Sequence, residues 1–255
     1  MRRIYVIGIG AGDPQHLTLQ AVEAMNRVDV FFTIDKGDDK GDLARLRTDL
    51  LDRHVTRHHR VVEAGDPERD RAAAPGGYEA AVVDWQERRE LIYQRMIADE
   101  LDEDGCGAFL VWGDPALYDG TLRILERIGA RGAVGFEVES IPGISSVQAL
   151  AARHRLILNR VGRPFMVTTG RRLAAEGLPA GMDDVVVMLD ARNAFATLPD
   201  PDLDIYWGAY LGTADEVLLH GDLQQVKGEI VRVRAEQRER KGWIMDTYLL
   251  RRRDG

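Results

Sequence analysis

The segment Val111-Trp112-Gly113-Asp114-Pro115-Ala116-Leu117-Tyr118-Asp119 carries most of the information about the architecture of this chain. It follows an apolar run, residues 108–112, that is typical of a buried strand, and it precedes a periodic segment, residues 122–127, that is typical of a helix. Gly113 and Asp114 therefore stand where a strand ends and the chain turns. Ligands of open α/β sheets bind at this carboxyl edge. Gly-Asp-Pro is also common in ordinary turns, so the motif alone is equally compatible with a structural role.

On the N-terminal side of this segment, strand-like and helix-like patterns alternate. Residues 4–7 form a continuous apolar run, as expected for a strand buried on both faces, and a glycine-rich loop, Gly8-Ile9-Gly10-Ala11-Gly12-Asp13-Pro14, follows. The patterns then predict helices over residues 17–25, 43–51 and 78–101, strands over residues 28–34, 61–62 and 134–138, and a polar loop over residues 65–77. Such alternation predicts a parallel sheet with right-handed crossovers.

The C-terminal part of the chain has a pattern of its own. The segment Ile141-Pro142-Gly143-Ile144-Ser145-Ser146 leads into a short helix through Leu150, and residues 160–164 look like a linker. Beyond the linker we predict a helix over residues 223–240 and strands over residues 165–169, 185–189, 205–209, 217–219 and 243–250. We therefore expect two domains, residues 1–158 and residues 159–255.

The composition argues against several classes of protein. The 255 residues carry a net charge of −8, which argues against general nucleic-acid binding because that requires clustered Lys and Arg. No stretch approaches about 20 apolar residues, and the N-terminus has no signal-peptide pattern, so we expect a cytoplasmic protein without a membrane span. The single cysteine, Cys106, is expected to be a buried, inert thiol. The six histidines show no metal-ligand spacing, so we expect no metal.

The first glycine-rich loop partly matches a dinucleotide-binding fingerprint. Gly8 and Gly10 match its first two glycines, but Asp13 replaces the third, and its charge would oppose a pyrophosphate. Asp35, at the end of the second strand, resembles the acid that binds a ribose. A nicotinamide-linked oxidoreductase therefore stays open as an alternative. Beside this loop, His16 is a candidate for helix-entry packing or for proton transfer.

Three motifs in this order resemble those of the tetrapyrrole methylases: residues 8–14, Gly113-Asp114-Pro115 with Tyr118, and residues 142–146. The members of this family are S-adenosylmethionine-dependent enzymes of corrin and sirohaem synthesis, and the resemblance covers essentially the whole chain. It implies an α/β fold of two domains, with an N-terminal parallel sheet, a C-terminal mixed sheet and the active-site trough between them. It also implies a homodimer.

Within the family, the chain most resembles one branch of enzymes. These enzymes act in aerobic cobalamin biosynthesis, where they methylate a precorrin at C-1 of the macrocycle and release its extruded acetyl group as acetate. The resemblance to this branch rests on residues 111–119, 205–213 and 242–250. The alternatives are another precorrin methyltransferase of the family and a non-catalytic corrinoid carrier.

The resemblance also implies which residues bind S-adenosylmethionine. In the first domain these are Pro14, Gly113, Asp114, Pro115, Tyr118, Ser145 and Ser146, and in the second domain Met188, Leu189, Ala209, Tyr210 and Leu211. Apolar side chains there would hold the adenine, and backbone groups would satisfy its edge. Ordinary strand core is an equally good interpretation of Met188 and Leu189, and a serine at the start of a helix commonly caps it.

Loss of the acetyl group requires a water molecule and an acid or base near the acetyl carbon. The candidates are Asp13, Asp246 and His16, and Asp13 is equally suited to helix capping. The precorrin substrate carries several carboxylates, and arginines bind carboxylates well. Candidate substrate-binding arginines are Arg69, Arg71, Arg171 and Arg172.

Overall fold

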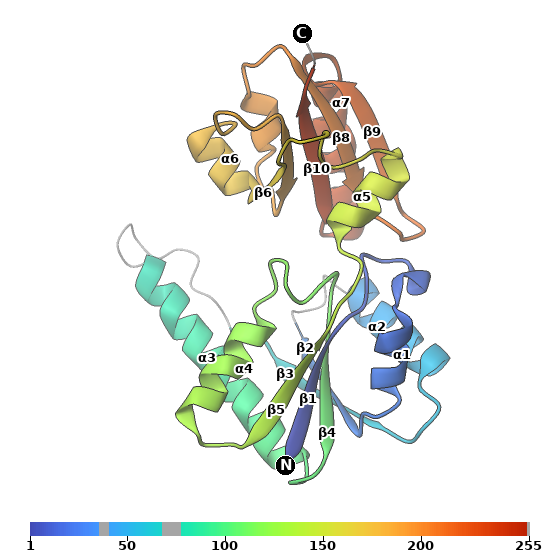
Figure 1. Ribbon diagram of the computed structural model, residues 1–255, viewed down its shortest axis with the longest axis vertical. Helices are drawn as coiled ribbons and strands as arrows, with labels where there is room; N and C mark the ends of the chain where they lie inside the picture. The colour runs from blue at the N-terminus through green and yellow to red at the C-terminus, as the bar shows by residue number, and fades with distance from the viewer. Residues whose placement is uncertain (36–40, 68–77, 254–255) are drawn as a thin grey trace. The chain divides into compact units, whose positions relative to one another are not determined.

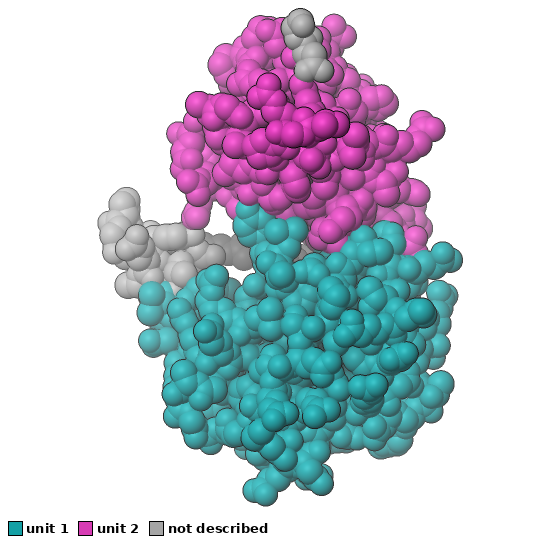
Figure 2. Space-filling view, viewed as in Figure 1, with its two compact units in different colours: residues 1–10, 14–144 teal, residues 11–13, 145–255 magenta. Residues whose placement is uncertain are grey.

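A computed structural model describes residues 1–35, 41–67 and 78–253. The chain forms two compact units, each built around a five-stranded sheet of its own (Figure 1; Figure 2). Unit 1 comprises Met1–Gly10 and Pro14–Ile144, and unit 2 comprises Ala11–Asp13 and Ser145–Gly255. The expected α/β fold, with a parallel sheet first and a mixed sheet second, is confirmed.

The sheet of unit 1, called sheet 1, is parallel, with its strands in the order β3-β2-β4-β1-β5. Its strands are β1 (Arg2–Gly8), β2 (Val30–Asp35), β3 (Arg60–Gly65), β4 (Cys106–Val111) and β5 (Phe136–Ile141). In β1, Ile4 and Val6 belong to one hydrophobic core, and Tyr5 and Ile7 belong to another. Because successive residues face opposite sides of the sheet, a strand buried on both faces has the continuous apolar run seen in the sequence.

Helices cover both faces of sheet 1. The helices α1 (Leu19–Met25) and α2 (Gly41–His54) pack on the face of Tyr5, and α3 (Tyr78–Glu100) and α4 (Thr121–Arg131) pack on the face of Ile4 (Figure 1). The helix after β1 and the helix after β4 thus lie on opposite faces, although β1 and β4 are hydrogen-bonded neighbours. Such a switch point opens a crevice at the carboxyl ends of the two strands, where α/β sheets bind ligands.

The sheet of unit 2, called sheet 2, is mixed, with its strands in the order β6-β7-β10-β8-β9. The strands β6 and β7 pair in parallel, and the other neighbours pair antiparallel. The strands are β6 (Met166–Thr169), β7 (Asp184–Met188), β8 (Leu203–Ala209), β9 (Val217–Asp222) and β10 (Asp246–Arg252), and the helices are α5 (Ser146–His154), α6 (Gly170–Glu176) and α7 (Leu223–Lys241). Trp207, Tyr210 and Tyr248 are the largest fully buried side chains of its core.

Differences from the sequence-based expectations lie mainly at the ends of elements. The last strand begins at Asp246 and not at Trp243, and the helix after Ser145 continues to His154. The sequence pattern does not predict α6, because a helix of 7 residues is too short to show a clear period. The expected loop over residues 65–77 begins inside β3, and its residues 68–77 lie outside the described part of the chain.

Two expectations concern the chain as a whole. The domain boundary at residues 158 and 159 stays a prediction, and the helix α5 before that boundary groups with unit 2. Within the ranges that the structure describes, no helix has the length and apolar character needed to cross a membrane.

Candidate functional site

Loops of unit 1 meet at the carboxyl ends of β1, β4 and β5. The Gly113 N–H donates to the Gly10 carbonyl at 2.8 Å, and the Gly10 N–H donates to the Gly113 carbonyl at 3.3 Å. Gly8 lies so close to the loop after β5 that a Cβ on it would be 2.6 Å from the Gly143 nitrogen. Close backbone packing therefore requires glycine here, and the parallel sheet brings the motifs together at one edge.

Asp114 fixes the geometry of this edge with its carboxylate. Its Oδ2 accepts a hydrogen bond from the Gly143 N–H at 2.9 Å, and its Oδ1 accepts one from the Ala116 N–H at 2.8 Å. Gly113 precedes it with a φ of 70°, a conformation that favours glycine. Because both carboxylate oxygens have backbone partners, Asp114 shapes the loop that a ligand at this edge would meet.

Tyr118, near the end of the same loop, has an unusual backbone conformation. Its φ is 55°, in the left-handed region, and the residue is 47% exposed. Pro115, three residues earlier, is buried. A left-handed conformation in a non-glycine residue costs energy, and such residues concentrate at binding sites.

Pro14 and His16 belong to a single 3₁₀ turn, Pro14–His16. A Cβ on Gly10 would collide with the Cβ of His16, and the buried Nδ1 of His16 has no hydrogen-bond partner among the described residues. The position of His16 therefore suits helix-entry packing, the first of its two interpretations. The helix α1 is capped by Thr18, whose Oγ1 accepts from the Ala21 N–H at 3.0 Å, so Asp13 does not cap it.

In unit 2, the end of β7, the end of β8 and the start of β10 share one edge of sheet 2. Met188 pairs with Thr247, and Ala209 pairs with Asp246. Leu189, directly after β7, has a φ of 54° and is 64% exposed. Leu189 is therefore not a buried residue of the strand core. It presents an apolar surface to solvent beside the half-buried Met188.

The segment Ala209-Tyr210-Leu211 differs from Leu189, because its side chains are buried. Tyr210 has a φ of 50°, and its hydroxyl donates to the Trp243 carbonyl at 2.6 Å. Burial raises the pKa of this hydroxyl, while Lys241 lowers it. A ligand at this edge would meet the backbone of the segment and not its side chains.

Asp246 lies in a buried polar network. Its Oδ2 accepts hydrogen bonds from Arg234 Nε and from Trp207 Nε1, each at 2.9 Å. Burial raises the pKa of the Asp246 carboxyl, although Arg234 and Trp207 act in the opposite direction. This geometry favours a role in anchoring β10 to α7.

The same network reaches the residue after Leu189. Arg234 donates to the backbone carbonyl of Asp190 at 2.5 Å, and the Asp190 Oδ2 accepts from the Tyr248 hydroxyl at 2.7 Å. The exposed Leu189 is therefore followed by a firmly anchored residue. Sequence reasoning does not find Arg234, because only the packing of α7 on the sheet brings it to this edge.

Ser145 and Ser146 start α5. Ser145 is its N-cap, and the Ser145 N–H donates to Gln148 Oε1 at 3.0 Å, as in a capping box. Ser145 therefore occupies the capping position that the sequence suggests for it. Ser146 Oγ accepts a hydrogen bond from Thr247 Oγ1 at 3.0 Å. Ser146 therefore reaches the start of β10, the strand that carries Asp246.

Asp13, at the tip of the first glycine-rich loop, belongs to unit 2. A Cβ on the preceding Gly12 would lie 2.6 Å from the Leu211 carbonyl oxygen, so the tip packs on the turn after β8. Glu216 and, more weakly, Asp13 raise the pKa of the Arg153 guanidinium on α5. Asp13 is therefore a half-buried carboxylate close to a cation.

The remaining candidates have the following positions. Arg171 and Arg172 lie in the first turn of α6, where Arg172 Nε pairs with Glu176 Oε2 at 2.9 Å. Arg69 and Arg71 lie outside the described residues.

Burial, and to a smaller extent the negative charge of Asp29, raise the pKa of the Cys106 thiol to about 11. Within the described ranges, no group of three or more His, Cys, Asp or Glu side chains is placed to hold a metal ion.

These features fit S-adenosylmethionine, which needs an apolar surface for its adenine and polar backbone groups for its edges. Among the described residues, five non-glycine residues have a left-handed φ, and Tyr118, Leu189 and Tyr210 of the predicted cofactor set are three of them. Two of these three are exposed large side chains. Strained residues concentrate at functional sites, so these three residues are candidates for contact with a ligand.

The sequence of this chain is similar to those of known proteins. Residues 3–227 match the model of the family Tetrapyrrole (Corrin/Porphyrin) Methylases. The chain is 50% identical over 253 residues to the "Precorrin-6A synthase [deacetylating]" of Sinorhizobium, covering 99% of this chain and 96% of that protein.

Two solved structures are similar as well. A cobalamin synthesis related protein (CobF) from Corynebacterium diphtheriae has a TM-score of 0.86 and 37% identity, with all of both chains covered. The uroporphyrin-III C-methyl transferase of Thermus thermophilus, solved in complex with S-adenosylhomocysteine, has a TM-score of 0.61 and 20% identity, covering 97% of this chain and 91% of that one. The second similarity concerns the fold alone.

Proposed function

This chain belongs to the tetrapyrrole (corrin/porphyrin) methylases, and on that premise we propose that it is an S-adenosylmethionine-dependent methyltransferase acting on a precorrin. The specific reaction that we propose is methylation of precorrin-5 at C-1 of the macrocycle, with release of acetate and formation of precorrin-6A, in aerobic cobalamin biosynthesis. The observation that carries this proposal is the similarity to the Sinorhizobium synthase, which extends through both units.

The residues that we propose for cofactor binding are found in each unit. Asp114 holds the loop from Gly113 to Tyr118 in shape, Leu189 and Met188 present an apolar surface, and the backbone of residues 209–211 presents polar groups. S-adenosylmethionine, when bound, supplies an activated methyl group on its sulfonium. The protein then mainly positions the reactants, which contributes roughly 7–11 kcal/mol, and this explains why the sequence shows no strong catalytic constellation.

Of the three acid–base candidates, Asp13 is the one that we propose for deacetylation. Asp246 already accepts hydrogen bonds from Arg234 and Trp207, and His16 is packed against Gly10. Asp13 would accept a proton from a water molecule as that water adds to the acetyl carbonyl carbon. The bond from this carbon to the macrocycle then breaks, its electron pair returns to the macrocycle, and acetate leaves.

Calorimetry with S-adenosylhomocysteine and, separately, with NADH tests the class of the enzyme. We expect micromolar binding of S-adenosylhomocysteine and none of NADH. The opposite result would overturn the proposal and favour the oxidoreductase suggested by Gly8, Gly10 and Asp35. Product mass then identifies the substrate, because another precorrin methyltransferase would add a methyl group without releasing acetate, and a corrinoid carrier would leave its ligand unmethylated.

Three further expectations belong to this proposal. We propose that the enzyme is a homodimer, which light scattering of the purified protein tests. The domain boundary at residues 158 and 159 and the cytoplasmic location stay predictions from the sequence.

A further inference from the structure

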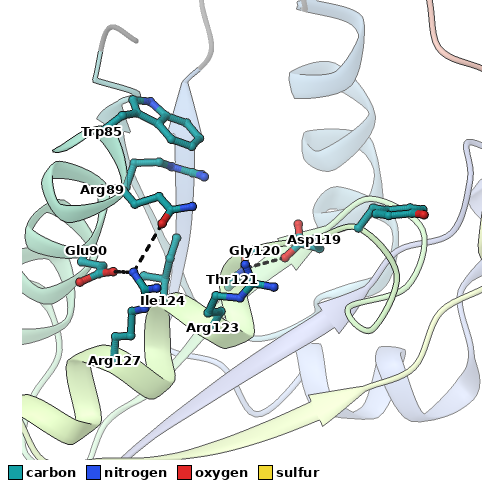
Figure 3. A pocket seen from close by; sticks show the side chains of 11 residues that line it. Trp85, Arg89, Glu90, Asp119, Gly120, Thr121, Arg123, Ile124 and Arg127 are labelled. Atoms are coloured by element: carbon teal, nitrogen blue, oxygen red, sulfur yellow. Dashed lines mark hydrogen bonds and ion pairs between the residues drawn. The ribbon is translucent and has the colours of Figure 1, made fainter. Parts of the chain in front are cut away.

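A cavity of about 260 Å³ lies in unit 1 between α3 and α4 (Figure 3). Its lining includes residues from the N-terminal halves of the two helices and from the end of the loop that begins at Gly113 and Asp114. Tyr118, of the predicted cofactor set, is one of the lining residues. The cavity therefore shares Tyr118 with the predicted cofactor set, and none of the roles assigned above uses its other lining residues.

The lining combines apolar surface with positive charge. Trp85 and Ile124 supply the apolar surface, and Arg89, Arg123 and Arg127 supply the charge. The Arg89 guanidinium lies 4.9 Å from the centre of the Trp85 ring, a distance typical of a cation–π contact (Figure 3). A ligand that suits this lining has an aliphatic part and an anionic end.

The carboxylates of the cavity already have partners. Glu90 is buried, and it pairs with Arg127 at 2.9 Å and also with Arg131. The Asp119 Oδ1 accepts a hydrogen bond from the Thr121 N–H at 2.8 Å. One carboxylate is thus shared by two guanidinium groups, which leaves the cluster with excess positive charge.

Arg123 differs from the other arginines of the cavity. Arg89 pairs with Asp66 at 3.0 Å and Arg127 pairs with Glu90, whereas the side chain of Arg123 has no ion pair or hydrogen bond within the described part of the chain. An exposed guanidinium that lines a cavity is able to bind a carboxylate in two-point geometry.

The size of the cavity limits what it can hold. Pockets that enclose a whole small ligand measure roughly 300–1,000 Å³, and a tetrapyrrole macrocycle is larger than most such ligands. A cavity of about 260 Å³ is too small for the macrocycle and suits one of its side chains.

We propose that this cavity receives one carboxylate arm of the tetrapyrrole substrate and that Arg123 pairs with its carboxylate. The proposal rests on the proposed function, since it takes the substrate to be a polycarboxylate macrocycle. The aliphatic part of the arm lies against Trp85 and Ile124, and Arg127 adds positive charge beside it. None of the four arginines named from the sequence lines this cavity among the described residues.

The test compares Arg123→Gln with Arg95→Gln, which removes the same charge from an exposed arginine of α3 that does not line the cavity. The probes are uroporphyrin, an air-stable tetrapyrrole with carboxylate arms, titrated by absorbance, and S-adenosylhomocysteine, titrated by calorimetry. We expect Arg123→Gln to weaken uroporphyrin binding roughly tenfold or more and to raise the KM for the precorrin similarly, with kcat and the S-adenosylhomocysteine Kd unchanged. Arg95→Gln should behave as the wild type.

The outcomes separate this proposal from the proposed function. If the wild type binds S-adenosylhomocysteine and Arg123→Gln binds uroporphyrin normally, the cavity assignment is wrong and the methyltransferase assignment stands. If the wild type binds neither probe, the proposed function fails and the cavity assignment fails with it. Acetate is titrated alone as well, and saturable binding below the millimolar range that Arg123→Gln abolishes would indicate a site for free small anions and overturn the substrate-arm assignment.

Discussion

Asp114 holds together two loops at the proposed cofactor site. Its two oxygens accept backbone hydrogen bonds from Gly143 and Ala116, so the carboxylate joins the loop after β4 to the loop after β5. A loop held in this way keeps its shape before a ligand arrives, which lowers the entropy cost of binding. The residue therefore belongs to the proposed cofactor site as a positioning residue.

We predict that Asp114→Ala weakens S-adenosylhomocysteine binding by roughly five- to a hundredfold, because a half-buried backbone N–H loses its acceptor at a cost of about 1–3 kcal/mol. Asp114→Asn should lose less, since its amide oxygen can still accept one hydrogen bond. Calorimetry measures the affinity, with Glu103→Ala, an exposed carboxylate before β4, as the matched control. An unchanged affinity in Asp114→Ala would remove Asp114 from the site.

Substitution of Asp13, also a change of a single residue, tests the proposed deacetylation step. We predict that Asp13→Asn slows acetate release by about 10²-fold or more, the usual contribution of a general base, while the S-adenosylhomocysteine Kd stays close to that of the wild type. Rates are followed by acetate release and affinity by calorimetry. A parallel loss of rate and affinity would mean that Asp13 only holds the loop tip against the turn after β8.

At the scale of elements, α7 anchors the edge of sheet 2 through Arg234. This side chain pairs with the buried Asp246 of β10 and donates to the Asp190 carbonyl after β7, so one helix residue joins two strands. Two residues earlier on the same helix, Arg232 pairs with Glu236 on the exposed surface at 2.7 Å. The two ion pairs differ in burial, which makes them a natural comparison.

We predict that Arg234→Met destabilises unit 2 by about 3–5 kcal/mol, because it leaves the Asp246 carboxylate buried without its cation. Arg232→Met should change the stability by about 0.5 kcal/mol or less, since exposed pairs contribute little. Urea unfolding monitored by circular dichroism measures both. Similar effects for the two variants would contradict the anchoring role of Arg234.

The pH dependence of this effect has a definite sign. Loss of Arg234 removes the largest influence that lowers the Asp246 pKa, so burial raises that pKa further above the value in the unfolded chain. A carboxyl group whose folded pKa is raised destabilises the fold as the pH rises above its unfolded pKa of about 3.9. The stability deficit of Arg234→Met should therefore be smallest near pH 4 and grow towards pH 8.

At the scale of the whole molecule, the proposed cofactor contacts come from two units with separate cores. Hydrogen exchange with mass spectrometry tests this directly. We predict that S-adenosylhomocysteine slows exchange in residues 112–118 of unit 1 and in residues 188–190 and 209–212 of unit 2. The second half of α7, residues 232–241, serves as the control and should not change. Protection confined to one unit would remove the residues of the other unit from the proposed cofactor set.

The sequence by itself determined the architecture and the motifs of the proposed site. Strand and helix periods are local properties, and a run of alternating strands and helices has few stable arrangements, so the parallel sheet and the meeting of its loops followed from topology. The order of the glycine-rich motifs was sufficient to indicate the family. The bounds of long elements such as α3 and α7 came within one residue at each end for the same reason.

Only the tertiary structure decided what individual side chains do. Asp114 finds its partner Gly143 across 29 positions, and Arg234 meets Asp190 across 44, distances along the chain over which no local pattern operates. The same holds for the cavity beside Arg123, whose walls come from two helices. Hydrogen-bond partners and cavities depend on which surfaces pack together, and that is a property of the folded chain and not of any segment.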